Sequence, residues 1–372
     1  MILSNPLMVD PRVHKEAKVL IDNGHEVTVI VWDRKQEHGP EAVVDGIRII
    51  RIHNKGLLKI LHYDLLRNPL WWYKAKKKAE ELYKNGYKFD VVHCHDLDTL
   101  QAGVWLKKKY KIKLVYDAHE MWGYLISQEL PEIVVRFAFY MEKKLVKNID
   151  QLITVSPPFK EYFKTITTKP ITLVMNFKDL KYKNYEPTNN KKFTLIYIGG
   201  MKKHRFFPEI VDIIGNLENT HLILAGKIEN LYYEMKKYSK KYNNIEFLGT
   251  IPTKDIIPKS RSADALFILV DPTSKHYQRT LFNKQFEAMV TGRPIIVTKG
   301  TYAGKMTEDL KCGITVEYNK ESVKKAIIKL RDNPQLCQEL GENALKAAKE
   351  KHNWEKEKKN LLKVYEEIKK WN

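Results

Sequence analysis

The sequence predicts an α/β protein with two doubly wound parallel-sheet domains that face each other across a cleft. Short runs rich in apolar and β-branched residues alternate with segments of helical periodicity along the whole chain. One polar, turn-rich stretch at 176–192 interrupts this alternation, as a linker between domains would. The length of 372 residues also exceeds what one ordinary core holds and suits two domains.

The first half of the chain contains predicted strands separated by predicted helices. The helix after the first strand begins at Pro11 and stops at Gly24, residue types that are typical of helix starts and ends. Nearly continuous apolar strands joined by helices form parallel sheets, so we expect a sheet with helices on both faces. The strands are expected at 1–5, 25–32, 47–52, 89–95, 113–119, 151–156 and 171–176, and the other helices at 69–85, 97–109, 131–148 and 157–166.

After the polar stretch the same alternation begins afresh, and ligands of such sheets bind at the carboxyl ends of the strands. The strands are expected at 193–200, 220–226, 245–250, 264–270, 293–298 and 313–318, and the closing helices at about 320–331, 335–350 and 354–371. The predicted organisation is an N-terminal domain over 1–175, a linker over 176–192, a second domain over 193–353, and a C-terminal helix over 354–372 that packs back on the first domain.

The composition predicts a cytoplasmic protein with anionic partners. The three cysteines lie far apart without CxxC or disulfide spacing, which favours a reducing compartment. The N-terminal "MILSNPLMVD" lacks the features of a signal peptide, and the longest apolar run, "ALFILV" at 265–270, is too short to cross a bilayer. The net charge of +20 favours nucleic acid, an anionic membrane surface or phosphate-bearing substrates; the alternative is the solvated lysine surface of a heat-stable protein.

A glycine pair ends the first strand of the second domain, in "IYIGGMKKHR" (196–205). Gly199 and Gly200 let the backbone approach a phosphate, the following helix start offers free N–H groups, and Arg205 adds a bidentate charge. The alternative is a tight turn with solvated lysines. Neither GxGxxG nor GxxxxGK[ST] occurs in the chain, which argues against a nicotinamide-dependent enzyme and a nucleotide-hydrolysing motor.

A second candidate site lies in "LFNKQFEAMVTGRPIIVT" (281–298), where Asn283 and Lys284 begin a helix and Glu287 follows one turn later. A carboxylate at this place can accept bonds from both hydroxyls of a ribose, with the helix N-terminus facing a diphosphate. Glu287 follows Phe286 in an apolar setting, where an unpaired carboxylate is costly. A binding role is therefore favoured over an incidental glutamate of an amphipathic helix.

Several blocks resemble, in order and spacing, those of the glycosyltransferase family 4 enzymes of the GT-B fold. The resemblance implies two Rossmann-like domains and a retaining transferase, which moves a sugar from a nucleoside diphosphate to a hydroxyl acceptor. It also implies a donor site in the C-terminal domain, an acceptor site in the N-terminal domain, and catalysis without a metal or other cofactor. The blocks are "SNPLMVDPRVHKEAKVLIDNGHEVTVIVWDR", "DVVHCHDLDTLQAG", "KLVYDAHE", "LITVS", "YIGG", "IEFLGTI" and "NKQFEAMVTGRPIIVT", and they span nearly the whole chain.

The resemblance also assigns roles to single residues. Glu287 matches the second glutamate of the E-x7-E motif, which binds the ribose, and Gly199 matches the glycine that ends the first strand of the donor domain. Arg205 falls where the family usually has a phosphate-binding lysine. His119 of "YDAHE" matches a histidine beside the transferred sugar, so we expect it to orient the sugar and stabilise developing charge.

Two positions depart from the family pattern. Arg279 replaces the first glutamate of the motif, and Gly200 stands where many members carry an arginine. The way in which the sugar hydroxyls are held, and therefore the identity of the sugar, stays open. Arg279 or Lys284 is expected to supply charge near the diphosphate.

The stretch "VVHCHDLD" (91–98) contains the residue types of a metal site, but its spacing argues against one. His93 and His95 share one face of a strand, and the metal-dependent hydrolases with a His-x-His-x-Asp-His run need aspartate where this chain has leucine. His93 is interpreted as a core histidine and Asp98 as the cap of the following helix. His95 and Asp96, at the end of the strand, are expected to line the acceptor side without a metal.

The loop "DPRVHKEA" (10–17) follows the first strand, and in the GT-B fold it overhangs the site from the N-terminal domain. Asp10 and Arg12 are expected to meet the acceptor or a phosphate. Capping of the helix by Asp10 is the equally favoured alternative.

The segment "LLKILHYDLLRNPLWWYKAKKK" (57–78) mixes paired tryptophans, leucines and lysines. This composition suits a helix on an anionic membrane surface, which would attach the protein to the inner face of the membrane. An ordinary helix whose aromatic side chains pack on the sheet is the somewhat favoured alternative.

The predicted function is a retaining, metal-independent hexosyltransferase reaction in the synthesis of a glycan, glycolipid or cell-surface polysaccharide. Its partners are a nucleotide-sugar donor and a glycan or lipid-linked acceptor; the nucleotide base, the sugar and the acceptor stay open. A nucleotide-sugar epimerase of similar fold is the first alternative. A basic nucleic-acid-binding protein is the second, although no recognised binding module occurs in the sequence.

Overall fold

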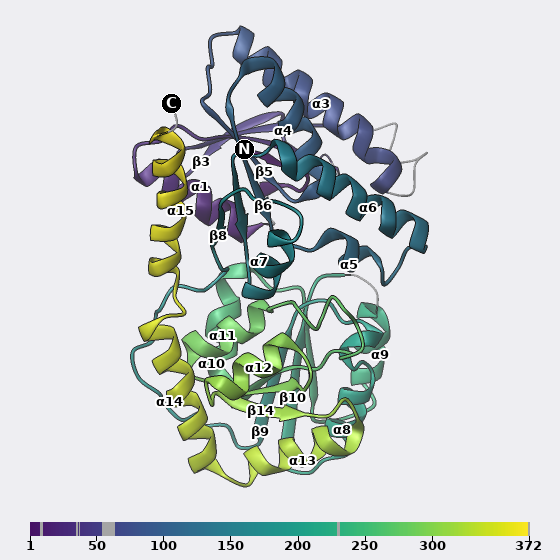
Figure 1. The fold of residues 1–372 in the computed structure, drawn as a ribbon. Helices are drawn as coiled ribbons and strands as arrows, with labels where there is room; N and C mark the ends of the chain where they lie inside the picture. Colours follow the sequence, from purple (N-terminus) through teal and green to yellow (C-terminus); the bar gives the residue numbers. More distant parts are fainter. Residues whose placement is uncertain (8–9, 35, 37, 54–63, 229–230, 371–372) are drawn as a thin grey trace. The chain divides into compact units, whose positions relative to one another are not determined.

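The computed structural model describes residues 1–372 except 8–9, 35, 37, 54–63, 229–230 and 371–372. The chain forms two compact units: Met1–Met175 together with Glu357 and the residues after it, and Asn176–Lys356. The stretch 176–192 is part of the second unit, and most of the C-terminal helix is part of the first (Figure 1). Each unit has its own sheet and its own hydrophobic core, so the prediction of two parallel-sheet α/β domains is confirmed.

The first unit contains an eight-stranded sheet in the order β3-β4-β2-β1-β5-β6-β7-β8. Its strands are β1 (Ile2–Leu3), β2 (Thr28–Trp32), β3 (Glu41–Val44), β4 (Ile47–Ile52), β5 (Val91–His95), β6 (Lys113–Ala118), β7 (Gln151–Thr154) and β8 (Ile171–Leu173). Neighbouring strands run parallel, except that β3 pairs antiparallel with β4 at one edge. Strand β3 was not predicted from the sequence, because its exposed and half-buried residues lack the apolar run that marks the buried strands.

Helices cover both faces of this sheet. The helices α3, α4, α6 and α7 connect successive strands in one direction along the sheet, so right-handed crossovers place them on one face, and α1 on the other. Tyr365 of α15 contacts His93, whose side chain points away from the neighbouring Cys94, so α15 lies on the face of α1. The bounds are α1 (Pro11–Asp22), α3 (Asp64–Lys84), α4 (Leu97–Tyr110), α5 (Trp122–Ile126), α6 (Glu132–Leu145), α7 (Pro157–Lys164) and α15 (Trp354–Lys370).

The paired tryptophans of the predicted membrane segment contribute to the core. Trp71 is buried and stacks on Trp32, with ring centroids 5.3 Å apart. Trp72 is half-buried and donates a hydrogen bond to the carbonyl of Asp98 at 2.7 Å. The packing alternative is therefore correct for both side chains, and the part of the segment before residue 64 lies outside the described residues. Among the described helices, none combines the length and the apolar character that a membrane span requires.

The second unit contains a six-stranded, fully parallel sheet in the order β11-β10-β9-β12-β13-β14. The strands are β9 (Phe193–Ile198), β10 (Thr220–Ala225), β11 (Ile245–Gly249), β12 (Ala265–Ile268), β13 (Ile295–Thr298) and β14 (Gly313–Val316). The helices between and after them are α8 (Glu209–Gly215), α9 (Tyr232–Ser239), α10 (Ile256–Ser262), α11 (Asn283–Thr291), α12 (Tyr302–Asp309), α13 (Lys320–Arg331) and α14 (Pro334–Glu350). The chain adds β10 and β11 on one side of β9 and then β12, β13 and β14 on the other side. The topological switch point therefore lies beside the carboxyl ends of β9 and β12.

Candidate active site

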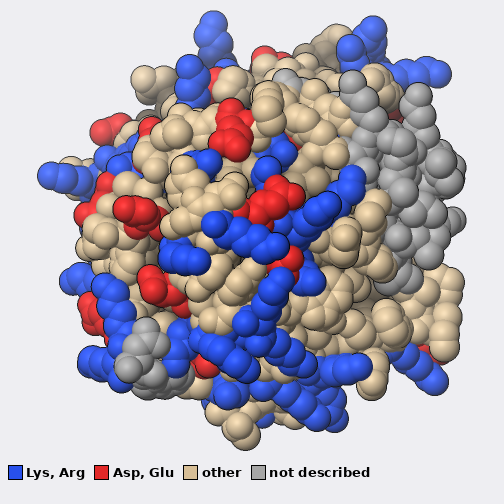
Figure 2. Space-filling view, turned by 90° about the horizontal axis from the view of Figure 1, so that it is seen from above, with Lys and Arg blue, Asp and Glu red and all other residues tan. Residues whose placement is uncertain are grey.

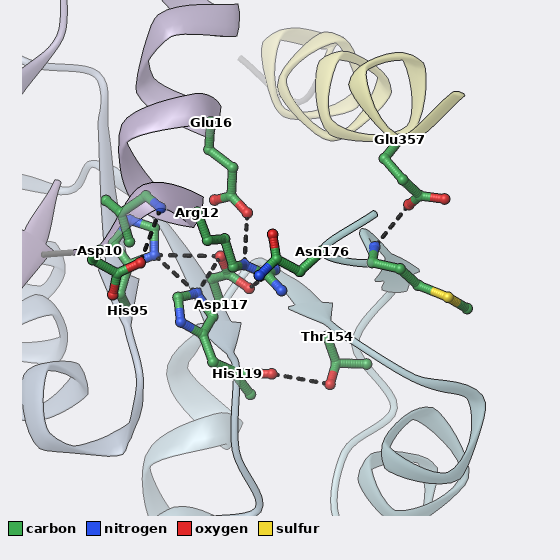
Figure 3. A network of polar contacts seen from close by, with 12 residues as sticks. Asp10, Arg12, Glu16, His95, Asp117, His119, Thr154, Asn176 and Glu357 are labelled. Atoms are coloured by element: carbon green, nitrogen blue, oxygen red, sulfur yellow. Dashed lines mark hydrogen bonds and ion pairs between the residues drawn. The ribbon is translucent and has the colours of Figure 1, made fainter. Parts of the chain in front are cut away.

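Asp117 is the centre of a buried polar network at the carboxyl edge of the first sheet (Figure 3). It lies on β6 in register with His95 on the neighbouring strand β5. Its Oδ1 accepts a hydrogen bond from Arg12 of α1 at 3.0 Å, and its Oδ2 lies 3.0 Å from Nε2 of His119. Burial acts to raise the pKa of Asp117, but Arg12 and His119 hold it well below its usual range. The carboxylate is therefore ionised between two cations.

His119 lies between two carboxylates. Besides its contact with Asp117, its Nδ1 lies 3.6 Å from Oδ2 of Asp96. Burial and the nearby Arg12 act to lower its pKa, but Asp117 and Asp96 outweigh them and raise it to about 10. The ring is thus an imidazolium at neutral pH, which donates hydrogen bonds and carries positive charge but does not act as a base.

Only some members of the network reach solvent. The side chains of His119 and Asp96 are exposed by 13% and 21%, whereas those of Arg12 and Asp117 are exposed by 5% and 0%. His119 is therefore placed to contact a ligand, with Asp117 as its buried support.

Asp96 occupies the position that begins α4, at a φ of 63°. Its side chain makes no bond to that helix; instead Oδ1 accepts the backbone N–H groups of His119 and Glu120 at 2.9 and 3.2 Å. The sparsely populated backbone conformation is thus compensated by bonds that fix the loop carrying His119. The prediction that Asp98 caps α4 is wrong, because Asp98 is buried in the first turn of the helix.

Asp10 caps α1 by accepting the backbone N–H of Val13 at 3.3 Å, which confirms the capping alternative. Arg12 is buried and engaged with Asp117 and with Glu16, whose Oε1 lies 2.8 Å from its Nε. The expected contact of Asp10 and Arg12 with an acceptor or a phosphate stays a prediction.

Four buried side chains, Glu16, His93, His95 and Asp117, place potential metal-ligating atoms within 4.8 Å of one another. The guanidinium of Arg12 already supplies the positive charge between the two carboxyl groups. Burial and Asp117 raise the pKa of Glu16 to about 8, which makes this carboxyl a poor ligand at neutral pH. The group fits a cation less well than an Arg–Asp–His network, and the expectation of no metal stays a prediction.

His93 is a buried core histidine, as predicted. Its Nδ1 lies 2.7 Å from the hydroxyl of Tyr365 on α15, and its ring stacks on that of His95 at 4.3 Å. Burial lowers the pKa of both histidines, so both are neutral at physiological pH. They connect the C-terminal helix to the network around Asp117 through uncharged rings.

The second unit brings two cations together at the carboxyl end of β9. Nζ of Lys284 lies 4.0 Å from the ring centroid of Tyr197, and Nη1 of Arg205 donates to the carbonyl of Gly200 at 3.3 Å and to the Tyr197 hydroxyl at 3.4 Å. Burial acts to raise the pKa of Tyr197, but Lys284 and Arg205 outweigh it and lower the pKa. The strand end therefore carries positive charge, which suits an anionic ligand.

Gly199 makes room for this arrangement. Its φ is 151°, and a Cβ at this position would lie 2.7 Å from Nζ of Lys284. A side chain here would displace the lysine from the strand end, which explains why glycine occupies this position.

Glu287 lies on α11, one turn after Lys284, and its side chain is buried. Among the described residues its Oε2 has no hydrogen-bond partner. Burial raises its pKa, although Lys178 and Lys284 oppose that shift. A buried carboxylate oxygen without a donor is a costly feature that a bound hydroxyl group would relieve.

Lys178 approaches this site from the stretch predicted as a linker. Its Nζ donates to Oδ1 of Asn283 at 3.0 Å, and Asn176 donates to the same oxygen at 2.8 Å. Arg279, which replaces the first motif glutamate, donates to the carbonyl of Lys275 at 2.8 Å. Its expected role near a diphosphate stays a prediction.

The structure thus brings the predicted residues into separate groups. In the first unit Arg12, His95, Asp96 and His119 share one network, and in the second unit Gly199, Gly200, Arg205 and Lys284 surround Tyr197. Three further residues of these groups, Asp117, Tyr197 and Lys178, were not predicted from the sequence. For Asp117 a signal existed, because it precedes His119 by two residues at the end of a predicted strand.

Comparison with known families gives matches over both units. The sequence profile of Glycosyltransferase Family 4 matches residues 11–182, and the profile of Glycosyl transferases group 1 matches residues 192–333. The alpha-monoglucosyldiacylglycerol synthase of Acholeplasma laidlawii is 25% identical over 358 residues, which cover 86% of this chain and 84% of that protein. An uncharacterized glycosyltransferase of Methanocaldococcus jannaschii is 25% identical over 318 residues, covering 78% and 79%.

Solved structures show the same fold. Sucrose-phosphate synthase from Thermosynechococcus elongatus superposes with a TM-score of 0.78 at 16% identity, over 100% of this chain and 99% of that chain. The Anabaena protein HepE, crystallised with UDP-glucose, gives a TM-score of 0.73 at 14% identity, over 98% of each chain.

Proposed function

The chain belongs to the family 4 glycosyltransferases of the GT-B fold, and on this premise we propose that it transfers a sugar, with retention of configuration, from a nucleoside diphosphate to a hydroxyl acceptor. The observation that carries the proposal is the buried Oε2 of Glu287 next to Lys284 in the second unit, which has no hydrogen-bond partner in the part of the chain that the structure describes. A nucleotide sugar offers ribose hydroxyls to the carboxylate and a diphosphate to the cations. The structure of the similar HepE with UDP-glucose supports this class of donor.

The second unit is proposed to hold the donor without a bound metal. Arg205 and Lys284 neutralise the diphosphate, and the N-terminus of α11 adds free N–H groups. These groups stabilise the negative charge that develops on the leaving diphosphate. Turnover is accordingly expected to persist in the presence of a chelator.

In the first unit, the imidazolium of His119 is proposed to donate a hydrogen bond to an oxygen of the reacting sugar. Since Asp117 and Asp96 keep this ring protonated, it does not take the proton of the acceptor hydroxyl. The leaving diphosphate oxygen is proposed as the base on the attacked face, and the hydroxyl proton passes to it as the C–O bond to the acceptor forms. This route is compatible with retention.

The acceptor is proposed to be a glycan or a lipid-linked acceptor, and the site of action the cytoplasm. The name of the similar Acholeplasma laidlawii protein, a synthase of a glucosylated diacylglycerol, supports a lipid-linked acceptor. The acceptor side is expected to include His95 and Asp96, which belong to the network around His119.

The donor assignment is tested with a double variant, Arg205→Gln with Lys284→Gln. The loss of two charge-assisted contacts, each worth about 1.5 kcal/mol, is expected to raise the Kd for a nucleoside diphosphate roughly 100-fold. Affinity for the uncharged nucleoside is expected to stay unchanged. Calorimetric titration with uridine, guanosine and adenosine diphosphates measures both effects and identifies the base.

The matched control replaces two exposed lysines of the same unit, Lys236→Gln with Lys237→Gln on α9. It lowers the net charge by the same amount without touching β9. If the double variant and this control bound the diphosphate equally well, the phosphate role of Arg205 and Lys284 would be refuted.

A further inference from the structure

Helix α6 presents a stripe of large apolar side chains to solvent. Ile133, Phe137 and Tyr140 are exposed by 74%, 48% and 59%. They are spaced by four and three residues, so they lie along one side of the helix. The opposite side is buried and fixed, since Glu142 accepts hydrogen bonds from the hydroxyls of Tyr116 and Tyr162 at 2.9 and 2.8 Å. The buried side thus holds α6 against the unit with the stripe turned to solvent.

Positive charge follows the stripe at the end of the helix. Lys143, Lys144 and Lys147 are exposed, and Nζ of Lys144 lies 5.7 Å from the ring centroid of Tyr140. Near the start of the helix, the exposed Glu132 is held by Arg136 at 2.6 Å, so its charge is compensated. The outer surface of α6 therefore combines apolar side chains with a net positive charge.

The same face of the first unit continues over α3 and α4. A shallow hollow of about 430 Å³ lies between these helices and is lined by Tyr73, Lys76, Trp105, Lys108 and Lys109. Both aromatic side chains of this hollow are exposed. Figure 2 shows that lysine and arginine side chains gather along one border of the molecule as seen from above.

We propose that the outer face of α3, α4 and α6, including the apolar stripe of α6, docks on a membrane surface that contains anionic lipids. Apolar and aromatic side chains flanked by lysines are what an interfacial helix inserts into the headgroup region. The cations add attraction to anionic lipids. A protein interface is depleted of lysine at its core, and a nucleic acid offers no apolar layer for Ile133 and Phe137.

This docking surface goes beyond the proposed function, because it involves none of the residues assigned to the donor or to the network around His119. It also differs from the predicted membrane segment, whose tryptophans pack inside the unit. Docking at α6 would bring the first unit, which is proposed to receive the acceptor, to a surface that holds lipid-linked sugars.

The test is co-sedimentation of the whole protein with vesicles of phosphatidylcholine alone or mixed with phosphatidylglycerol, at low and high salt. The apolar variant and the charge variant are each expected to lower the partition coefficient for the mixed vesicles about 100-fold. The control variant, which changes exposed residues of the same kinds on α9 of the second unit, is expected to bind like the wild type. The substitutions are Ile133→Ser, Phe137→Ser and Tyr140→Ser; Lys143→Gln, Lys144→Gln and Lys147→Gln; and, for the control, Tyr233→Ser, Lys236→Gln and Lys237→Gln.

Salt-sensitive binding to the mixed vesicles that only the two α6 variants lose would support the proposal. Failure of the wild type to bind either vesicle, or equal binding by all variants, would overturn it. Concentration-dependent dimerisation that the apolar variant abolishes, without vesicle binding, would show that a second copy covers the face and would also overturn it. Nucleoside diphosphate binding, measured on the same samples, reports separately on folding and on the proposed function.

Discussion

Replacing Glu287 with glutamine is expected to weaken the binding of the nucleotide sugar about 100-fold while leaving the protein at least as stable as the wild type. The carboxylate is buried, and burial raises its pKa, so the folded protein bears a desolvation cost that a neutral side chain of the same shape avoids. The lost affinity corresponds to two hydrogen bonds from ribose hydroxyls to a charged acceptor, each worth about 1.5 kcal/mol. Calorimetric titration and the thermal unfolding midpoint measure the two effects.

The control for this variant is Glu339→Gln, an exposed glutamate on α14 of the same unit. It is expected to change neither affinity nor midpoint. Affinity for the 2′,3′-dideoxy form of the nucleotide should fall in the wild type but not further in Glu287→Gln, because the hydroxyls and the carboxylate form one interaction. Equal discrimination by both proteins would refute the ribose assignment.

Replacing Asp117 with asparagine is expected to lower kcat at pH 7.5 about 100-fold. This is the order of magnitude by which kcat falls when an active site loses one preorganised hydrogen-bond donor. Asp117 is a positioning residue, since it is fully buried and acts through His119. In the variant, burial and Arg12 still lower the pKa of His119, and of the two carboxylates only Asp96 still raises it. His119 would then be largely neutral at pH 7.5.

The pH dependence distinguishes this role from a structural one. In the wild type the imidazolium is present below its pKa of about 10 and is lost as the pH rises through that value, so kcat should fall only on the alkaline side. In Asp117→Asn this fall is expected to move toward neutral pH, together with the imidazole titration followed by NMR. A smaller shift in the same direction is expected for Asp96→Asn, which serves if Asp117→Asn fails to fold.

The control is Asp150→Asn in the same unit, because Asp150 accepts bonds from Lys107 and from the backbone N–H of Leu114, at the opposite end of β6 from His119. Its pH profile is expected to match that of the wild type. If the fall of kcat at alkaline pH occurred at the same pH in Asp117→Asn and Asp96→Asn as in the wild type, the role given to the two carboxylates would be contradicted.

The buried strands were predictable because a parallel sheet covered on both faces requires continuous apolar runs, as in β5 and β12. The edge strand β3 has no such run, since only one side of an edge strand packs on other elements. A local signal did exist: Asp45 and Gly46, both at positive φ, form the tight turn between β3 and β4. The sequence pattern also did not show that Trp71 faces the core. The same pattern suits a helix on a membrane surface and a helix whose aromatic side chains pack on the sheet.

The candidate site was predictable where a residue type signals chemistry within a local motif, as for Glu287 and His119. The supporting residues were not, because their roles depend on pairs that are distant in sequence. Arg12 and Asp117 are separated by 105 positions, and so are Lys178 and Asn283. Asp98 was predicted as the helix cap, but Asp96 occupies that position and its carboxylate accepts hydrogen bonds from the loop after β6.

Sugar transfer itself is tested most directly by NMR of the products formed by the whole protein from a panel of nucleoside diphosphate sugars, with and without a simple glycoside or glycolipid acceptor. We expect release of the nucleoside diphosphate and a new glycosidic bond whose anomeric configuration equals that of the donor, also in the presence of a chelator. An isomerised nucleotide sugar without nucleotide release would show an epimerase, and a product of inverted configuration would contradict the proposed route of the proton.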